Sequence, residues 1–492
     1  MTSAGGKDRL TMRILKRAAI VIMSAILAVS AFAITASAAN GALEIWDGTV
    51  AEGFAGGDGT EENPYLISNG SQLAYLMKTV NESEDETNST TYGKFYKLTA
   101  DIYLNDISDY ESWDVDNAPE NIWTPDGGVF HYDHIGFAGT FDGAGFDVKG
   151  VYVNRKEQYN GLFGYLFNAD VKNLGVTHSY INGGQYTAGL AGYARASKRN
   201  VTLSGCSVSD TTVIGTSSVG GVFGYLESYN KRTTVEKCSS DASITARYNS
   251  AGGIAGFLAP YGISYNLGET KDYAVRISDC VNFGDITAGN GVGGIIGSSQ
   301  DIVSDAFIYP EDDPRYIPPE KQPRIGVLIE RCVNAGRIRG SSKSGTLAGI
   351  LGPADRDDQF VEIDLVGCYG TKNGTTELYG VTRSTLTVKD SSTIEDKLLG
   401  TKDTFKGFSF DNVWDIIDAR PVIRRLGDTF GKGGVSAEGF FAALELAIGT
   451  LGENDVELSN IDFDGDGEFT LSDLNAFINY TRGKGASDKS AS

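Results

Sequence analysis

Short stretches of alternating apolar and polar residues fill the chain from about residue 140 to 390. Segments such as 169–183 (ADVKNLGVTHSYING) and 280–294 (CVNFGDITAGNGVGG) keep the alternation for four to six residues, the period of a strand with one buried face. The apolar spacing of an amphipathic helix is absent from this region of the sequence. The pattern therefore predicts an all-β fold built from many short strands.

A G-x-x-G motif recurs through the same region. It begins at residues 161, 189, 221, 253, 294 and 349, so successive starts lie 28, 32, 32, 41 and 55 residues apart. Short strands at such a period predict a right-handed parallel β-helix, a solenoid in which each coil buries its apolar face by stacking on the next. A β-propeller has a similar period but needs four strands per repeat, whereas these repeats hold two or three.

One helix is predicted before the repeats. Ser68 is its expected N-cap, and Leu73, Leu76, Met77 and Val80 share one face at helical spacing. We expect this helix to cover the open end of the solenoid, where the first coil would otherwise expose a sheet edge. A binding role is the alternative.

The N-terminus predicts export. Five basic residues precede an apolar run from Ala18 to about Thr35, and small residues follow at 36–38. This is the pattern of a secretory signal peptide, here residues 1–38. An uncleaved membrane anchor is the alternative, because the run is nearly long enough to span a bilayer.

The net charge of the chain limits which partners it is expected to bind. Without residues 1–38 the chain has 37 Lys and Arg against 63 Asp and Glu, a net charge of −26. Nucleic acids and anionic membrane surfaces both select basic patches, so neither is an expected partner. No second apolar stretch approaches membrane-spanning length, and an extracellular location is predicted.

Five cysteines occupy one phase of the repeat. Each closes a short β-branched stretch and follows an apolar residue three positions earlier. Because equivalent positions of stacked coils form columns, we expect a row of free, buried thiols acting as small hydrophobes. Disulfides, or a metal or catalytic role, are the alternatives in an exported protein. The five are Cys206, Cys238, Cys280, Cys332 and Cys368.

Several phrases resemble the GLUG-motif proteins of bacterial surfaces. They are the G-x-x-G units, "VKNLGV", "CVNFGDI", 137–153 (FAGTFDGAGFDVKGVYV) and 56–76 (GGDGTEENPYLISNGSQLAYL). The resemblance covers roughly residues 45–425. It implies a right-handed parallel β-helix, extracellular display and an adhesive or glycan-binding role, but no catalytic constellation.

A calcium loop is predicted at 462–473, within NIDFDGDGEFTLSDL. Carboxylates alternate at loop positions 1, 3 and 5, a glycine allows the sharp turn at position 6, and a carboxylate closes the loop at position 12. These hard oxygen ligands suit Ca²⁺. The predicted ligands are Asp462, Asp464, Asp466, Glu468 through its backbone carbonyl, and Asp473.

The aspartate at position 12 and the lack of an entering helix resemble a dockerin module, here residues 427–485. The resemblance implies a cohesin domain of a scaffoldin as partner, contacted by Leu471 and Ser472 at loop positions 10 and 11. Dockerins carry two half-motifs, and the first half at 428–439 has lost its carboxylates at three positions, now Phe430, Lys432 and Gly439. We therefore expect one calcium site and one metal-free half.

Candidate catalytic carboxylates are few. Asp312-Asp313 and Asp357-Asp358 are adjacent pairs, and glycosidases need two carboxylates across the scissile bond. Neither pair is followed by the Gly-His-Gly or Arg-x-Lys phrases of pectinase-type β-helices. Solvated loop charges are the preferred interpretation.

The chain has three histidines. His131 and His134 flank Asp133 and could ligate a metal, but the sequence offers no third ligand nearby. His178 is expected on the surface of a coil. An insertion at 300–325 holds Tyr309 and Tyr316, whose rings could stack on sugars; a surface excursion without a ligand is the alternative.

Two functions follow from these patterns. The first is a cohesin-docking extracellular protein that displays a carbohydrate-binding or adhesion module on a cellulosome-like scaffold. The second is a dockerin-borne polysaccharide lyase or glycoside hydrolase, which would gather carboxylates and a basic residue on one face of the solenoid. The expected organisation is a signal peptide 1–38, a cap with first strands 39–136, the β-helix 137–426, the dockerin-like module 427–485 and a disordered tail 486–492.

Overall fold

The computed structural model describes residues 44–83, 89–125, 136–261, 271–299, 312–314, 324–340, 347–353, 361–373, 377–380, 386–410, 413–417 and 419–423, with isolated residues between these ranges and toward the C-terminus. The predicted signal peptide, Tyr309 and Tyr316 lie outside the described residues. So does most of the predicted dockerin-like module.

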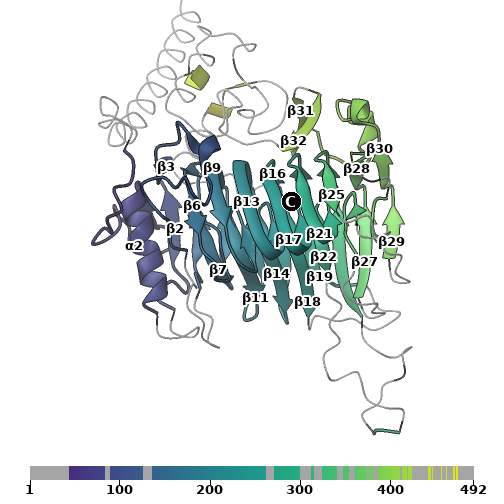
Figure 1. The fold of residues 1–492 in the computed structure, drawn as a ribbon, viewed down its shortest axis with the longest axis horizontal. Coiled ribbons are helices and arrows are strands. Elements are labelled where there is room, and N and C mark those ends of the chain that lie inside the picture. The colour runs from purple at the N-terminus through teal and green to yellow at the C-terminus, as the bar shows by residue number, and fades with distance from the viewer. Residues whose placement is uncertain are drawn as a thin grey trace, which may run out of the picture.

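Three sheets of parallel strands make up most of the described chain (Figure 1). The ten-stranded sheet has the order β1 (Tyr65–Ile67), β2 (Phe95–Leu98), β4 (Thr140–Asp142), β8 (Asp170–Lys172), β12 (Val201–Ser204), β15 (Thr233–Glu236), β19 (Tyr273–Ser278), β23 (Ile325–Glu330), β27 (Val361–Val366) and β29 (Leu386–Lys389). The five-stranded sheet comprises β7 (Phe163–Phe167), β11 (Ala191–Ala196), β14 (Phe223–Tyr229), β18 (Ala255–Tyr261) and β22 (Ile296–Ser299).

The remaining parallel strands form a fifteen-stranded sheet. Its members are β3 (Ile102–Tyr103), β5 (Asp147–Lys149), β6 (Tyr152–Asn154), β9 (Gly175–Asn182), β10 (Thr187–Ala188), β13 (Ser207–Gly220), β16 (Ser239–Ser240), β17 (Ser243–Gly252), β20 (Val281–Asn282), β21 (Ile286–Gly293), β24 (Val333–Asn334), β25 (Ile338–Gly340), β26 (Leu347–Ala348), β28 (Tyr369–Thr371) and β30 (Ser392–Ile394). The described residues also include the short 3-10 helices η1 (Tyr110–Ser112), η4 (Asp396–Leu398) and η5 (Lys402–Thr404).

The chain visits the three sheets in rotation. Consecutive strands β11, β12 and β13 enter three different sheets, and β14, β15 and β16 repeat the cycle one coil later. Each strand therefore pairs with the equivalent strand of the next coil, as Leu203 with Val235 and Val235 with Ile277. The predicted all-β, solenoid-like arrangement is confirmed.

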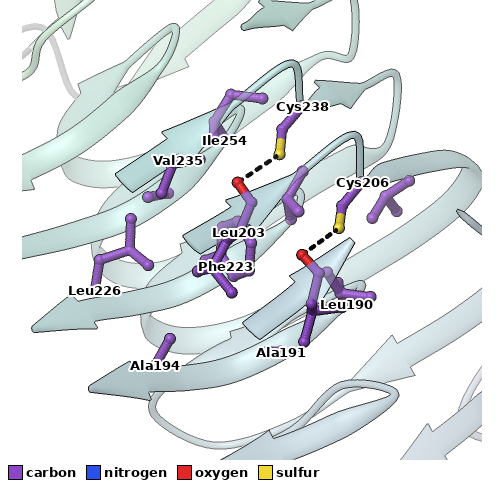
Figure 2. Packing of buried hydrophobic residues seen from close by; sticks show 14 of the residues in the cluster. Leu190, Ala191, Ala194, Leu203, Cys206, Phe223, Leu226, Val235, Cys238 and Ile254 are labelled. Carbon is purple, nitrogen blue, oxygen red and sulfur yellow. Dashed lines mark hydrogen bonds between the residues drawn. The ribbon is translucent and has the colours of Figure 1, made fainter. Parts of the chain in front are cut away.

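The cysteine row is confirmed as well. All five cysteines are free and fully buried. The Cys238 thiol donates a hydrogen bond to the Leu203 carbonyl of the preceding coil, and Cys206 packs in the equivalent place one coil earlier (Figure 2). Their complete burial suits a role as small core residues.

A left-handed corner explains the phase of this row. The residue immediately before each cysteine has a positive φ, which turns the chain from the ten-stranded to the fifteen-stranded sheet. Such a corner favours glycine, and Asx and a few other residues adopt it at a cost. The corner residues are Gly205, Lys237, Asp279, Arg331 and Gly367, with φ of 62°, 54°, 52°, 50° and 62°.

The G-x-x-G glycines mark a second column, where coils approach each other closely. A Cβ atom on Gly221 would lie 2.2 Å from the carbonyl oxygen of Gly253, and one on Gly253 would lie 2.3 Å from that of Gly294. No side chain fits at such distances. The motif is therefore a consequence of backbone packing between coils.

The helix before the repeats is α2 (Gly70–Asn81), and the four predicted apolar residues on it are buried. Figure 1 shows it at the N-terminal end of the stack, beside β2. The predicted N-cap was wrong by one residue: the Asn69 side chain, not that of Ser68, accepts the Gln72 amide hydrogen bond (3.1 Å). Ser68 instead donates its backbone N–H to the Gln72 side chain (2.8 Å), which closes a reciprocal capping arrangement.

The last described segment folds back onto the flank of the solenoid. An antiparallel hairpin of β31 (Trp414–Ile417) and β32 (Arg420–Ile423) carries Trp414, which is fully buried. The Trp414 indole donates to Asp279 (2.9 Å), and Arg331 donates to both oxygens of the same carboxylate (2.8 Å each). We call these three residues the Trp414 clasp. Among the described residues, no helix is long and apolar enough to cross a membrane.

Candidate functional site

The residues after the first four G-x-x-G motifs form an aromatic column. Tyr165 on β7, Tyr193 on β11, Tyr225 on β14 and Phe257 on β18 stand in register on neighbouring strands. The next residue along β14, Leu226, is fully buried in the core. Because side chains alternate along a strand, the column lies on the outer face of the five-stranded sheet.

The rings of this column stack. The centroids of Tyr193 and Tyr225 are 4.7 Å apart with planes at 14°, and those of Tyr225 and Phe257 are 5.1 Å apart at 6°. Tyr159 and Tyr186 form a second layer, stacked on each other at 5.4 Å, and each meets Tyr193 edge-on. Aromatic pairs of this kind contribute about 0.5–1.5 kcal/mol each beyond the area they bury. The rings therefore stabilise one another's positions.

A buried carboxylate lies beside the column. Glu227, two residues after Tyr225 on β14, is 8% exposed. The Tyr193 hydroxyl donates to its Oε2 (2.7 Å), and Arg195 Nε lies 3.2 Å from the same atom. The Arg195 guanidinium also lies over the Tyr229 ring, 4.6 Å from its centroid. An unpaired buried carboxylate would be costly, and these two contacts give the Glu227 carboxylate its partners.

The phenols of the cluster stay neutral over the ordinary pH range. Burial raises the pKa of Tyr159 and of Tyr261 to about 12. Burial also raises the pKa of Tyr193 and Tyr225, and the charge of Glu227 adds to both shifts. We call the whole set the tyrosine platform: Tyr159, Tyr165, Tyr186, Tyr193, Arg195, Tyr225, Glu227, Tyr229, Phe257 and Tyr261.

A second polar cluster lies on the ten-stranded sheet. Lys271 Nζ is 2.8 and 3.0 Å from the two oxygens of Asp364 and 3.2 Å from Oε2 of Glu362. The Tyr273 hydroxyl donates to Asp364 (2.6 Å), which is 8% exposed. We call these four residues the lysine clamp. It ties together strands that are two coils apart.

The clamp depends on a glycine in the coil between. Lys271 and Tyr273 lie at β19 and Asp364 lies on β27, while β23 separates the two strands. A Cβ on Gly326 of β23 would lie 3.1 Å from the Tyr273 ring and 2.4 Å from the Asp272 carbonyl oxygen. Only glycine leaves room for this crossing.

The clamp assembles two carboxylates and a basic residue on one face, the arrangement that a glycosidase or lyase would need. Its chemistry fits catalysis poorly. A general acid must hold a proton to donate, whereas both carboxylates here are ion-paired with one ammonium group. Burial and the hydrogen bond to Asp364 raise the pKa of Tyr273 to about 12, so it makes a poor base at neutral pH. The arrangement suits a cross-link between coils.

One predicted calcium ligand can be described. Asp473 is fully buried, and its Oδ2 accepts hydrogen bonds from the Thr470 amide (2.9 Å) and hydroxyl (2.8 Å). The Leu474 amide donates to the Thr470 carbonyl (3.1 Å), which forms a helical turn at this point. The donor set of the predicted loop, oxygen ligands dominated by carboxylates, fits Ca²⁺ by its chemistry. The other predicted ligands, Asp462, Asp464, Asp466 and Glu468, and the predicted cohesin contacts, Leu471 and Ser472, lie outside the described residues.

The other predicted candidates that the structure describes do not form a site. Within the described ranges, no group of three or more His, Cys, Asp or Glu side chains is placed to hold a metal. Asp312 is exposed, and His178 packs edge-on against the Tyr110 ring at 4.6 Å. His131, His134 and the Asp357-Asp358 pair lie outside the described residues.

Neither the platform nor the clamp was predicted. The platform has a sequence signal, because the residues that follow five successive G-x-x-G motifs are Tyr165, Tyr193, Tyr225, Phe257 and Ser298. An alignment of the repeats by their glycines would have displayed this aromatic column. The clamp has no comparable signal, since Tyr273 and Asp364 are 91 residues apart across insertions of unequal length.

The comparisons with known proteins find partial similarity only. No protein-family model matches the chain. Halomucin of Haloquadratum walsbyi is 31% identical over 177 residues, which are 34% of this chain and 2% of that protein. A protein of Evansella cellulosilytica named as a Gly-rich membrane protein is 33% identical over 130 residues, 26% of this chain and 12% of that protein. The chain therefore matches only a small part of the length of these relatives.

One solved structure is similar in outline. It is a Bacteroides ovatus protein assigned as an immunoglobulin A1 protease, 20% identical, with a TM-score of 0.49 over 75% of this chain and 95% of that one.

Proposed function

We propose that this chain is an extracellular, non-catalytic protein that binds polysaccharide or cell-surface glycan through the tyrosine platform. Its body is a right-handed parallel β-helix of the GLUG type. Its C-terminal dockerin-like module attaches it to the cohesin domain of a scaffoldin, as in a cellulosome-like assembly.

The observation that carries the proposal is the platform itself. A set of stacked aromatic rings with hydroxyl groups at their edges, beside one arginine and one carboxylate, offers apolar surface and hydrogen bonds together. Sugars present the same combination, apolar C–H faces ringed by hydroxyls. Packed tyrosines also lose little entropy on binding, because their neighbours restrict their rotamers before the ligand arrives.

The tail supplies the attachment in this proposal. Asp462, Asp464, Asp466, Glu468 and Asp473 would hold Ca²⁺, which orders the loop ahead of the helical turn that begins at Thr470. Leu471 and Ser472 would then face the cohesin. Names of relatives such as halomucin and a Gly-rich membrane protein agree with a place at the cell surface, which is proposed for this chain as well.

A polysaccharide panel tests the binding role. The chain from residue 39 to 492 is incubated in calcium with plant and host polysaccharides, and retention, new reducing ends and unsaturated uronate products are measured. Retention on a polysaccharide without product is expected. Product from any substrate would overturn the non-catalytic reading in favour of a lyase or glycosidase, and Asp364→Asn would then show whether the lysine clamp takes part.

A separate measurement tests the attachment. Cohesin-bearing scaffold fragments should capture the chain in calcium and release it in chelator, and Asp462→Ala should abolish capture. Lys372→Met, a surface change on the solenoid, is the matched control. Capture that ignores both chelator and Asp462→Ala would contradict a calcium-ordered dockerin.

A further inference from the structure

We infer that the ligand of the tyrosine platform is a neutral polysaccharide rather than a uronate or sulfated one. This inference rests on the proposed function and narrows it to a substrate class. Its support is the charge balance of the outer face of the five-stranded sheet, taken together with the fixed hydrogen bonds of the platform.

The platform has no net charge. Its one carboxylate, Glu227, and its one cation, Arg195, neutralise each other at 3.2 Å. The guanidinium is further engaged, because it lies over the Tyr229 ring. An acidic sugar arriving here would have to break the Arg195–Glu227 pair and leave a buried carboxylate without its counter-ion.

The neighbouring basic residues are also engaged. Lys198 lies over the Phe167 ring, with its Nζ 5.6 Å from the centroid, and Arg199 Nη1 lies 2.6 Å from Asp170. Recognition of a carboxylate or sulfate group needs cations that can turn toward it, usually bidentate arginine. Arg195, Lys198 and Arg199 already have acidic or aromatic partners.

The tyrosine hydroxyl groups of the platform also suit a neutral sugar as ligand. Tyr193 donates to Glu227, and Tyr159 and Tyr261 keep their protons up to about pH 12. They therefore offer donors and acceptors to sugar hydroxyls over the whole physiological range. Within the column Tyr165 and Phe257 are buried, at 2% and 7% exposed. The rings that a ligand can reach are therefore the partly exposed Tyr193 and Tyr225, with Tyr159, Tyr186, Tyr229 and Tyr261 around them. These rings come from several coils, which favours polymers over single sugars.

The test compares neutral with anionic polysaccharides in one assay. Affinity electrophoresis of the chain 39–492 would use mixed-linkage glucan, galactomannan, polygalacturonate and alginate. We expect retardation by a neutral polymer that changes little between low and high salt. Tyr225→Ala should weaken it about tenfold. Tyr248→Ala, which removes a 65% exposed tyrosine outside the platform, should leave it unchanged.

A charge change sharpens the test. Glu227→Gln keeps the shape of the platform but leaves Arg195 without its carboxylate, so we expect new, salt-sensitive retardation by polygalacturonate or alginate. Far-ultraviolet circular dichroism of each variant checks that it has folded, and Tyr193→Phe, which keeps the ring, serves as a second binding variant.

The outcomes separate the two proposals. Retardation by anionic polymers alone in the unmodified chain would overturn the neutral ligand class and leave the binding function standing. Equal loss in Tyr225→Ala and Tyr248→Ala would overturn the platform as the site. Retardation by none of the polymers, together with no binding to immobilised neutral or anionic glycans, would overturn both.

Discussion

The tyrosine platform and the lysine clamp are built from the same three groups, on two faces of one solenoid. Each joins a tyrosine hydroxyl, a buried carboxylate and a basic side chain within hydrogen-bonding distance. In the platform the carboxylate shares one cation, and aromatic rings surround the pair. In the clamp one cation holds two carboxylates and bridges two coils. The residues around such a triad therefore decide whether it forms part of a binding surface or cross-links two coils.

The largest expected effect is unfolding at alkaline pH, which should distinguish the tyrosine platform from the lysine clamp. Burial raises the pKa of Tyr159 and Tyr261 from 10 to about 12, so the folded state favours their protonated forms. Their contribution to stability is complete below pH 10 and is lost as the pH rises from 10 to 12. We expect cooperative unfolding in that window, followed by circular dichroism and tyrosinate absorbance.

Single tyrosine variants assign this unfolding to one region. Tyr159→Phe should move the alkaline midpoint to higher pH, because the ionisable group is gone. Replacing both Tyr159 and Tyr261 by Phe should move it further than Tyr273→Phe, because two phenols with a raised pKa are then removed instead of one. A larger shift for Tyr273→Phe would reverse the comparison.

Removal of the Lys271 ammonium group should cause the next largest loss of stability. Lys271→Met leaves Asp364 and Glu362 facing each other without a counter-ion, and Lys271 is 23% exposed. We expect a loss of about 2–3 kcal/mol in the free energy of unfolding, somewhat below the figure for fully buried pairs. Urea denaturation measures it. Lys372→Met removes an ion pair whose partners are 46% and 56% exposed, and should cost less than about 1 kcal/mol.

A methyl group on Gly326, where the lysine clamp crosses β23, should cause a slightly smaller loss of stability. Gly326→Ala places a Cβ 2.4 Å from the Asp272 carbonyl oxygen, so β19 and β23 must shift. We expect a loss of about 1–2 kcal/mol, as for other overpacked sites, in the same urea experiment. Gly53→Ala, where no atom lies within 4 Å of the added Cβ, is the matched control. Equal midpoints for the two variants would show that the crossing is not tightly packed.

The smallest effect is the loss of one hydroxyl in each cluster. Tyr193→Phe removes a donor from Glu227, which keeps only Arg195 nearby, and should cost about 1–1.5 kcal/mol. Tyr273→Phe removes a donor from Asp364, which keeps both contacts with Lys271, and should cost less. Thermal denaturation of the two variants side by side measures the difference. A larger loss for Tyr273→Phe would mean that the clamp is held mainly by its phenol.

The features that the sequence predicted are those that recur with the coil. Cysteine in one phase, glycine at close approaches and alternating apolar residues repeat every coil, so a local pattern is enough to place them. The helix was predicted from its apolar spacing, but its cap was misplaced, because Ser68 and Asn69 are both good capping residues and only the backbone decides between them. The calcium loop stays a prediction, which the sequence alone allows because all its proposed ligands fall within twelve residues.

The clusters on the outer faces depend on register between coils. Glu227 meets Tyr193 because β14 pairs with β11, and a 34-residue separation hides that contact in the sequence. The insertion near residue 300 shifts the period further, so Lys271 and Asp364 cannot be paired by counting repeats. Tyr309 and Tyr316 were predicted to stack on sugars because they lie in an insertion between coils. The observed aromatic column lies on strands instead.

The Trp414 clasp has a mechanical consequence. Tension applied to the C-terminal tail reaches the solenoid through β32 and Trp414, and Trp414 is fastened to Asp279. The chain between these two residues forms a closed loop that holds β20 to β30. While the clasp holds, the load bypasses those coils and enters the middle of the stack. The last coils can then stay folded while the C-terminal tail is under tension.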